Sequence, residues 1–163
     1  MISIYSSTLT RNNTFFTRDR GLSGLLYYYE AIRISFHRSG MYRLSTNSTF
    51  ISFGYIYNNT FDPFSPRSNV LTWNYTTQNN QQFNLFMNFT ETNSYILIVT
   101  TLYVNVVGSF SVIARGLGEV SFSPLIQSGM LKTNTRMNID ESWHIRENIR
   151  QHTKDRNTNI RQW

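Results

Sequence analysis

Few of the residues that could do chemistry are grouped in a recognisable motif in this 163-residue chain. The three histidines, His37, His144 and His152, have no mutual spacing that would bring them to one metal ion. Residues 141–144 fit the pattern Glu-x-x-His, which is half of a carboxylate metal site and requires a second copy that the chain lacks. A solvated helix face explains this pair better. We therefore expect no metal site and no cofactor.

Sequences that bind nucleotides or activate a nucleophile are also missing. Gly116 and Gly118 follow a predicted strand, but the third glycine of a dinucleotide fingerprint is replaced by Ser121, and another strand follows. No nucleophile elbow and no P-loop occur. The carboxylates before residue 124 are widely separated, and they are Asp19, Glu30, Asp62, Glu91 and Glu119. The sequence thus predicts a protein that is not an enzyme.

The composition favours an uncharged, hydroxyl-rich surface. Asn, Ser and Thr occur 18 times each, about a third of the chain, whereas charged residues make up 15%, against about 25% in an average protein. The net charge of +6 comes from 13 Arg and two Lys against nine acids. Most of the arginines stand alone rather than in a basic stripe with aromatic residues between them. We therefore expect no nucleic-acid partner.

The cysteine count and the apolar runs bear on whether the protein has disulfides, a signal peptide or a membrane-spanning segment. The absence of cysteine excludes a disulfide framework and thiolate metal sites. The first ten residues do not have the pattern of a signal peptide. The longest apolar stretch, residues 95–107, is interrupted by polar residues and is too short to cross a hydrocarbon core of about 30 Å as a helix. We expect no membrane insertion by this segment, and we expect a fragment of a longer chain if the protein is extracellular.

Short runs of alternating apolar and polar residues, separated by turn residues, extend from the N-terminus to residue 123. This pattern is typical of an all-β fold, and it predicts an antiparallel two-sheet β-sandwich, jelly-roll-like, over residues 2–123. The run 95–104 is apolar at nearly every position and should be a central strand covered on both faces. The other expected strands lie near residues 32–36, 42–44, 51–57, 71–75, 83–89, 110–114 and 120–122.

The composition becomes polar after the sandwich. Residues 124–163 are expected to be a linker and a polar, basic tail, either weakly helical or disordered. Asn138, followed three residues later by Glu141, is a cap-like signal for a short helix at 139–151.

Five N-x-S/T sequons are candidate glycosylation sites, at Asn12, Asn47, Asn58, Asn74 and Asn88. Their number is close to what the composition gives by chance. Their placement is more informative, because strand alternation puts the last three opposite their apolar neighbours and therefore toward solvent. By the same parity Trp73, together with Leu71 and Tyr75, is expected to be a core anchor.

The cluster Tyr27-Tyr28-Tyr29 is a candidate binding site. Core parity in this strand is set by Ile32 and Ile34, so Tyr27, Tyr29 and Arg33 should point outward, where the two rings could stack on a sugar or anchor a partner. The alternative is that the tyrosines cover a sheet edge or pack under an N-terminal strand. The same parity places Glu30 on the core side, which requires a bulge or a position at the sandwich rim.

The order of these segments resembles the pre-peptidase C-terminal-like domain, a β-sandwich module of secreted multidomain proteins. The similarity covers about residues 22–122. The matching stretches are 28–34, Ser39-Gly40-Met41-Tyr42-Arg43-Leu44, 53–58 with Asp62-Pro63, 95–99 and 108–112. The resemblance implies an extracellular, non-catalytic accessory or adhesion module, and some relatives bind matrix proteins or Ca²⁺. Residues 73–78 contain no carboxylate where the family commonly has acidic residues, so we expect no Ca²⁺ site here.

The sequence therefore predicts a non-catalytic structural or adhesion module, monomeric, within a larger secreted or cell-surface protein. Its partner would be an extracellular protein or a glycan. The alternative is a carbohydrate-binding module with exposed aromatic rings. Exposure of Tyr27 and Tyr29 distinguishes the two hypotheses, since a sugar platform needs both rings facing solvent.

Overall fold

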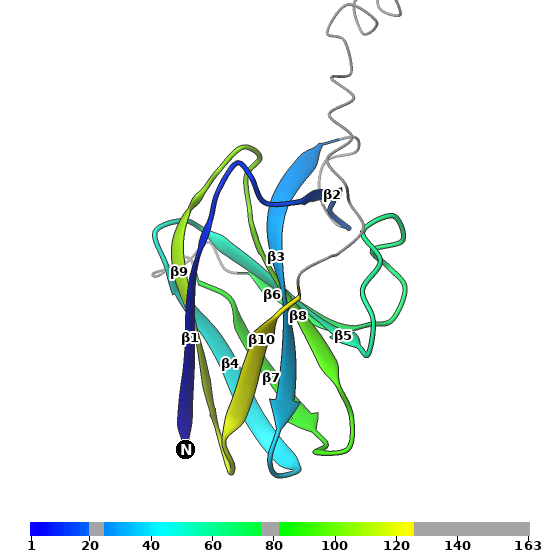
Figure 1. Ribbon diagram of the computed structural model, residues 1–163, viewed down its shortest axis with the longest axis vertical. Helices are drawn as coiled ribbons and strands as arrows, with labels where there is room; N and C mark the ends of the chain where they lie inside the picture. The colour runs from blue at the N-terminus through cyan, green and yellow to red at the C-terminus, as the bar shows by residue number, and fades with distance from the viewer. Residues whose placement is uncertain (20–24, 76–81, 126–163) are drawn as a thin grey trace, which may run out of the picture. The chain divides into compact units, whose positions relative to one another are not determined.

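A computed structural model describes residues 1–19, 25–75 and 82–125, and these residues form ten strands and no helix (Figure 1). The expected helix at 139–151 and almost all of the expected tail lie outside the described residues. The strands are β1 (Ile2–Leu9), β2 (Phe15–Thr17), β3 (Leu26–Phe36), β4 (Gly40–Ser48), β5 (Ser52–Asn58), β6 (Val70–Tyr75), β7 (Asn84–Phe89), β8 (Tyr95–Thr101), β9 (Gly108–Gly116) and β10 (Val120–Pro124).

Two antiparallel sheets pack face to face, which confirms the predicted sandwich. The four-stranded sheet has the order β1-β9-β4-β7. The six-stranded sheet has the order β10-β3-β8-β5-β6, and β2 pairs with β3 beyond the end of β10. Without β2 and β10, the two orders 1-9-4-7 and 3-8-5-6 describe a jelly roll, in which consecutive strands alternate between the sheets except at β5 and β6, which pair with each other.

The main core fills the space between the sheets and comes from one parity of each strand. Ile32 and Ile34 of β3 meet Leu44 of β4 and Val112 of β9, and all four are fully buried. Phe36 stacks on Phe89 with ring centroids 4.0 Å apart. The core also takes in Leu85, Leu97, Val99, Phe110 and Ala114. Strand β8 is buried along its whole length between β3 and β5, as the continuous apolar run predicts.

A second apolar cluster lies on the outer face of the six-stranded sheet. It is built from Phe16 of β2 together with aromatic and aliphatic residues of β3, β5 and β8. Its fully or nearly fully buried members are Phe16, Tyr27, Tyr29, Ala31, Phe53, Tyr55, Tyr57, Ile96 and Ile98. Because of this cluster, the six-stranded sheet is covered on both faces.

Glu30 lies at the sandwich rim, which is one of the two positions that its parity allowed. The pairing of β3 with β8 is regular from Tyr29 to Ile34, so no bulge intervenes. The Glu30 carboxylate accepts hydrogen bonds from the Tyr5 hydroxyl and from Ser7 Oγ of β1, the latter at 2.8 Å. Hydroxyl groups of one sheet therefore satisfy the carboxylate of the other.

Candidate binding surface

Tyr27 and Tyr29 are not exposed, so the expectation that they point to solvent as a binding site is wrong, and the alternative, in which they pack under an N-terminal strand, agrees with the structure. Tyr27 is 3% and Tyr29 1% exposed. Their parity is as expected, since they lie on the face opposite Ile32, but that face is covered by β2 and by residues 58–69 rather than by solvent. Arg33 alone of the three is exposed. A sugar platform at Tyr27 and Tyr29 is therefore excluded.

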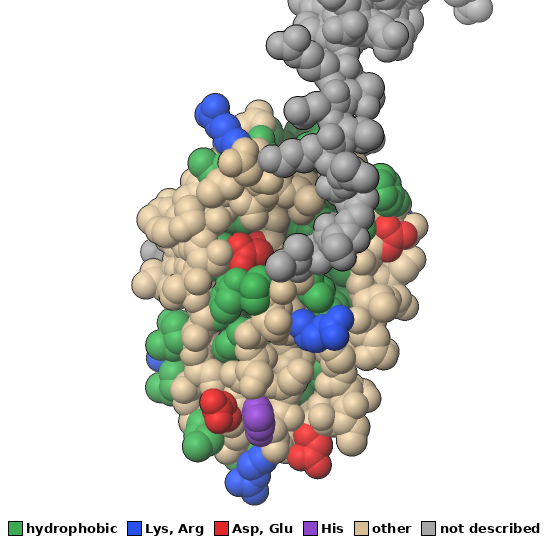
Figure 2. Space-filling model, viewed as in Figure 1, with side chains coloured by type: hydrophobic (Ala, Val, Ile, Leu, Met, Phe, Trp, Pro, Cys, Tyr) green, Lys and Arg blue, Asp and Glu red, His purple; other side chains and the backbone are tan. Residues whose placement is uncertain are grey.

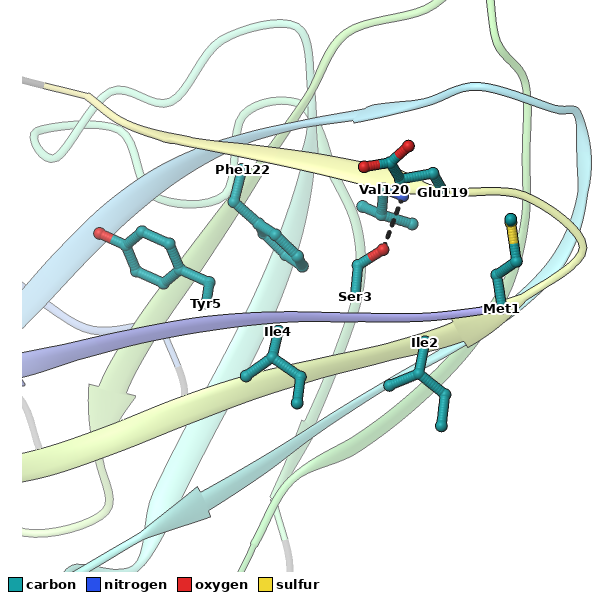
Figure 3. Close-up of a pocket in the computed structure, with 8 residues that line it drawn as sticks. All are labelled: Met1, Ile2, Ser3, Ile4, Tyr5, Glu119, Val120 and Phe122. Carbon is teal, nitrogen blue, oxygen red and sulfur yellow. Dashed lines mark hydrogen bonds between the residues drawn. The ribbon is translucent and has the colours of Figure 1, made fainter.

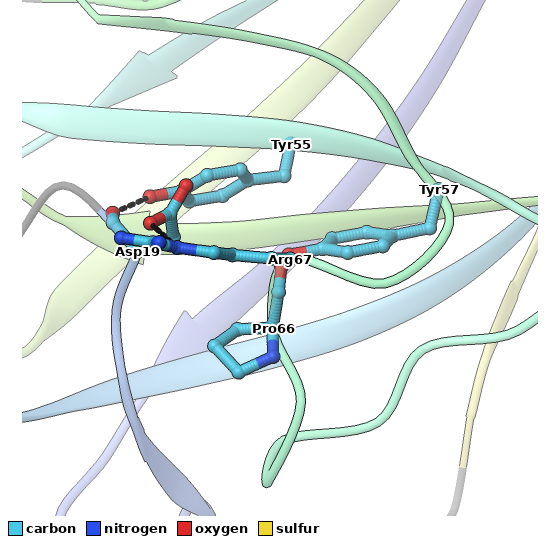
Figure 4. Close-up of polar contacts among 5 residues, drawn as sticks. All are labelled: Asp19, Tyr55, Tyr57, Pro66 and Arg67. Carbon is cyan, nitrogen blue, oxygen red and sulfur yellow. Dashed lines mark hydrogen bonds and ion pairs between the residues drawn. The ribbon is translucent and has the colours of Figure 1, made fainter.

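Hydrogen bonds from two buried tyrosines hold the covering segments in place (Figure 4). The Tyr55 hydroxyl donates to the backbone oxygen of Asp19, and the Tyr57 hydroxyl donates to that of Pro66 at 2.7 Å. Arg67 Nε donates to Asp19 Oδ1 at 2.7 Å and so joins the two segments. Burial, with a contribution from the Asp19 charge, raises the pKa of Tyr57. The tyrosines of this face are anchors of the fold.

Arg18 is part of the same cover. It is 5% exposed, and its guanidinium carbon lies 4.3 Å from the ring centroid of Tyr27 and 4.4 Å from that of Phe53. Nη1 donates to the backbone oxygen of Thr101 at 2.9 Å. The buried charge is thus held between two aromatic rings, an arrangement that cation–π attraction favours.

Trp73 and Asn74 point to opposite sides, but the sides are the reverse of those expected. Trp73 is half-buried on the outer face, packed against Phe53 at 5.8 Å between ring centroids. Tyr75 is 41% exposed beside it. Asn74 faces the neighbouring sheet, where its Oδ1 accepts a hydrogen bond from the backbone N–H of Asn84 at 2.9 Å. Parity separated the two side chains correctly, but it could not decide which apolar face was the main core.

The remaining four sequon asparagines, Asn12, Asn47, Asn58 and Asn88, have exposed side chains. Asn74 is the exception, since it is half-buried and its oxygen is engaged. Strand alternation predicted solvent-facing side chains for Asn58, Asn74 and Asn88, and this expectation agrees with the structure at Asn58 and Asn88 and fails at Asn74.

The outer face of the four-stranded sheet is the best candidate for a binding surface, and sequence analysis did not single it out. Four large apolar side chains stand on it with 60–63% exposure. They are Ile2 and Ile4 of β1, Met41 of β4 and Phe86 of β7. Arg43 and Arg115 lie between them. We call these six residues the basic apolar face.

The pairing register places the two arginines side by side. Arg43 of β4 is directly opposite Arg115 of β9, and the same row continues to Ile2 of β1 and Phe86 of β7. Directly opposed residues have Cβ atoms about 5 Å apart, so like charges there repel. Four strands therefore present one row in which two positive charges lie between apolar side chains.

The two arginines have different surroundings. Arg43 Nε donates to Asn84 Oδ1 at 2.7 Å, and the Arg43 guanidinium lies 5.5 Å from the ring centroid of Phe86. Arg115 is exposed and has no hydrogen-bond or ion-pair partner among the described residues. No Asp or Glu occurs at the outward positions of β1, β9, β4 and β7. The positive charge of this face is therefore uncompensated on the face itself.

The other half of the same sheet face is polar. Ser6 Oγ and Ser111 Oγ are 2.8 Å apart across β1 and β9, and a shallow groove of about 520 Å³ lies beside them. Hydroxyl and amide side chains line most of this groove, which includes Asn47, Ser48 and Thr49 of a sequon. The sheet face thus changes from apolar and basic at one end to uncharged and hydroxyl-rich at the other.

The sequence contained part of the signal for the basic apolar face. Alternation alone gives Ile2 and Ile4 one parity in β1, and it gives Arg43 and Phe86 the outward parity in their own strands. Only the register shows that these residues form one row across strands far apart in sequence. Long-range pairing is the information that the sequence pattern lacks.

Comparison with known proteins adds no family. No family model matches the chain, and no curated protein matches it. Among residues 1–19, 25–75 and 82–125, no three His, Asp or Glu side chains come together as metal ligands would. In the same part of the chain no helix is long and apolar enough to cross a membrane.

Proposed function

We propose that this chain is a non-catalytic binding module of a secreted or cell-surface protein, and that it binds a protein partner through the basic apolar face. The observation that carries this proposal is the row Ile2-Arg115-Arg43-Phe86 on an exposed sheet face without carboxylates. The partner surface would be acidic and partly apolar.

The apolar residues favour a protein over a polyanionic glycan. Contiguous exposed apolar side chains are characteristic of protein–protein interfaces. Arginine and aromatic residues are enriched among the residues that contribute most to binding energy. A sulfated glycan would satisfy Arg43 and Arg115 but would leave Met41, Phe86, Ile2 and Ile4 exposed. A protein with carboxylates between apolar side chains satisfies both.

The two arginines supply specificity. Each guanidinium group can donate two hydrogen bonds to one carboxylate in a bidentate pair, and the attraction of an acidic partner offsets the repulsion between Arg43 and Arg115. In the unbound protein this repulsion disfavours the fold slightly. Binding would remove that cost.

A labelled peptide of alternating Glu and Leu residues tests the proposal by fluorescence anisotropy. Arg43→Gln and Arg115→Gln should each weaken binding by about tenfold, because each removes a charged hydrogen-bond donor to a carboxylate. Arg33→Gln is the matched control, since Arg33 is equally exposed but lies on the other sheet. Equal effects of all three substitutions would mean that net charge, not this face, attracts the peptide.

Glycosylation tests separately whether the sequons are accessible, as an extracellular setting would require. Expression through a eukaryotic secretory pathway should give glycans at exposed asparagines outside the basic apolar face, such as Asn12 and Asn58, detected by mass spectrometry before and after enzymatic deglycosylation. Asn74 should remain unmodified, because its half-buried side chain faces the neighbouring sheet and is held there by the hydrogen bond that Oδ1 accepts from Asn84. Full modification of Asn74 in the folded protein would contradict the position described for β6.

A further inference from the structure

Strand β1 has an open edge, on which none of its backbone groups is paired with another described residue. It pairs with β9 on one side only, in an unbroken register from Ile2 to Leu9. Met1 and Gly116 exchange both backbone hydrogen bonds, at 2.6 and 3.2 Å. Because an antiparallel ladder alternates, the odd residues of β1 bond β9 and the even residues direct their N–H and C=O groups to the open edge. These residues are Ile2, Ile4, Ser6 and Thr8.

The other described edge strands are shorter or protected. Edge strands are commonly shielded by prolines, bulges, charges or short length. β10 has five residues, ends at Pro124, and donates the Val120 N–H to Ser3 Oγ. β6 has a register shift against β5, and the backbone N–H at the start of β7 is bound by Asn74. β1 has eight residues without charge, proline or bulge.

A cleft lies beside this edge, between β1 and β10 (Figure 3). Its volume is about 440 Å³. Figure 3 shows Ser3 and Tyr5 pointing toward β10, while Ile2 and Ile4 point to the opposite side of β1. Tyr5 and Phe122 meet with ring centroids 5.8 Å apart, and the space-filling view in Figure 2 shows apolar side chains exposed where β1 and β10 lie. The cleft can therefore take apolar side chains.

The charged side chains around the cleft are acidic. Glu119 is exposed and lines the cleft. Glu30 is half-buried and is bound to Tyr5, the residue at the other end of the lining, and to Ser7. Among the described residues no Lys, Arg or His side chain lines the cleft, and the Met1 ammonium at its end donates to the backbone oxygen of Gly116. An occupant with basic residues near its ends would complement these two carboxylates.

We infer that β1 accepts an extended polypeptide segment of another protein, which adds as a fifth strand to the four-stranded sheet. The open N–H and C=O groups require a polypeptide backbone, so a sugar or a small molecule does not fit them. Alternate side chains of the segment enter the cleft beside Tyr5 and Phe122, and the others lie next to Ile2 and Ile4. Lys or Arg near the segment ends pairs with Glu30 and Glu119. This site adjoins the basic apolar face, with which it shares Ile2 and Ile4, but its backbone pairing uses the strand edge and does not involve Arg43 or Arg115.

The probe is the labelled peptide acetyl-Lys-Val-Thr-Val-Thr-Val-Lys-amide, added to the uniformly ¹⁵N-labelled protein. Amide exchange followed by NMR should show that the peptide protects Ile2, Ile4, Ser6 and Thr8 at least about tenfold, because their N–H groups become hydrogen-bonded. The odd residues Ser3, Tyr5 and Ser7 should change little, since β9 already binds them. Protection of odd and even residues alike, or at β6 or β7, would overturn the inference.

N-methylated peptides separate backbone pairing from side-chain attraction. One peptide is methylated on the amides of its Val residues and the other on those of its Thr residues, so the side chains stay the same. Strand addition requires that one peptide loses binding and the other keeps it, since only alternate N–H groups face β1. Equal binding or equal loss by both peptides, or no binding of the parent peptide at millimolar concentration, would overturn the inference.

Glu119→Gln tests the charge complementarity, with Glu91→Gln as the control in the exposed turn between β7 and β8. Glu119→Gln should weaken the binding of the parent peptide about two- to fivefold, which corresponds to one exposed ion pair. Glu91→Gln should leave the binding unchanged. Protection of the even amides without any peptide, increasing with protein concentration, would show that a second copy occupies the edge. That outcome would overturn the assignment to another protein.

Discussion

The outer faces of the two sheets have similar composition but opposite environments. The six-stranded sheet carries Tyr27, Tyr29 and Tyr55 on its outer face, and all three are buried under β2 and residues 58–69. The four-stranded sheet carries Ile2 and Phe86 on its outer face, both more than 60% exposed. Aromatic and aliphatic residues on a strand thus show that a face is apolar, not whether the protein itself covers it.

The arginines on the two faces also have different surroundings. Arg18 is buried between two rings and bonded to a backbone oxygen, so its charge is part of the fold. Arg115 lies opposite Arg43 without a partner among the described residues, so its charge does not stabilise the fold. Side chains on the outer face of the six-stranded sheet therefore stabilise the fold, whereas we expect those of the basic apolar face to bind a partner.

The same substitution on the two faces should give the largest contrast. Phe16 is 2% exposed and contacts the rings of Tyr29 and Phe61 edge-on, whereas Phe86 is 61% exposed. Phe16→Ala should lower the free energy of unfolding by about 3–5 kcal/mol through lost burial and a cavity. Phe86→Ala should stay within about 0.5 kcal/mol. Urea unfolding of both variants measures the difference, and a small effect at Phe16 would mean that the cover does not belong to the stable core.

The second contrast is between arginines. Arg18→Ala removes two cation–π contacts and a charged hydrogen bond, so the free energy of unfolding should fall by about 2 kcal/mol. Arg33→Ala is the control. Arg33 lies in β3 and is exposed, so its replacement should change the free energy of unfolding little. An unchanged denaturation midpoint for Arg18→Ala would show that burying this cation costs as much as its contacts contribute.

Alkaline pH tests the buried tyrosines. Burial and the bond to Glu30 raise the pKa of Tyr5 to about 12, and burial together with the Asp19 charge raises that of Tyr57. Because unfolded tyrosine loses its proton near pH 10, the unfolded state binds fewer protons than the folded state above that pH. The contribution of these two protonated tyrosines to the free energy of unfolding is complete below pH 10 and should be lost as pH rises toward 12. Urea unfolding at intervals across this range should show a smaller decline in Tyr5→Phe and Tyr57→Phe than in the parent protein.

The fold followed from the sequence because alternation and turns are local properties. The central strand at 95–101 follows from a continuous apolar run, and the core positions of Phe110 and Val112 follow from alternation within one strand. For Glu30 the alternation left two possibilities open, a bulge or a position at the rim, and the structure shows the second. The binding surface did not follow, because it depends on contacts between strands far apart. Tyr27 and Trp73 were assigned to solvent and to the main core because nothing local shows that β2 and residues 58–69 fold over one sheet. The pairing of Arg43 with Arg115 spans 72 positions and leaves no local pattern.

The smallest effect tests why the two arginines are adjacent. Arg115→Thr removes one of two like charges directly opposed across β4 and β9, and it introduces a β-branched residue that suits a strand. Both changes favour the fold, so the free energy of unfolding should rise by about 0.3–0.5 kcal/mol at low salt. Added salt screens the repulsion in the parent protein, so the gain should shrink above about 0.5 M NaCl. Arg38→Thr, at an exposed turn position outside the sheets, is the control and should not show this salt dependence.

If Arg115→Thr stabilises the protein and also weakens its binding of the acidic peptide, Arg115 belongs to the binding surface. A loss of stability in Arg115→Thr at low salt would instead make the arginine pair part of the fold, and the difference between the two faces would then lie in exposure alone.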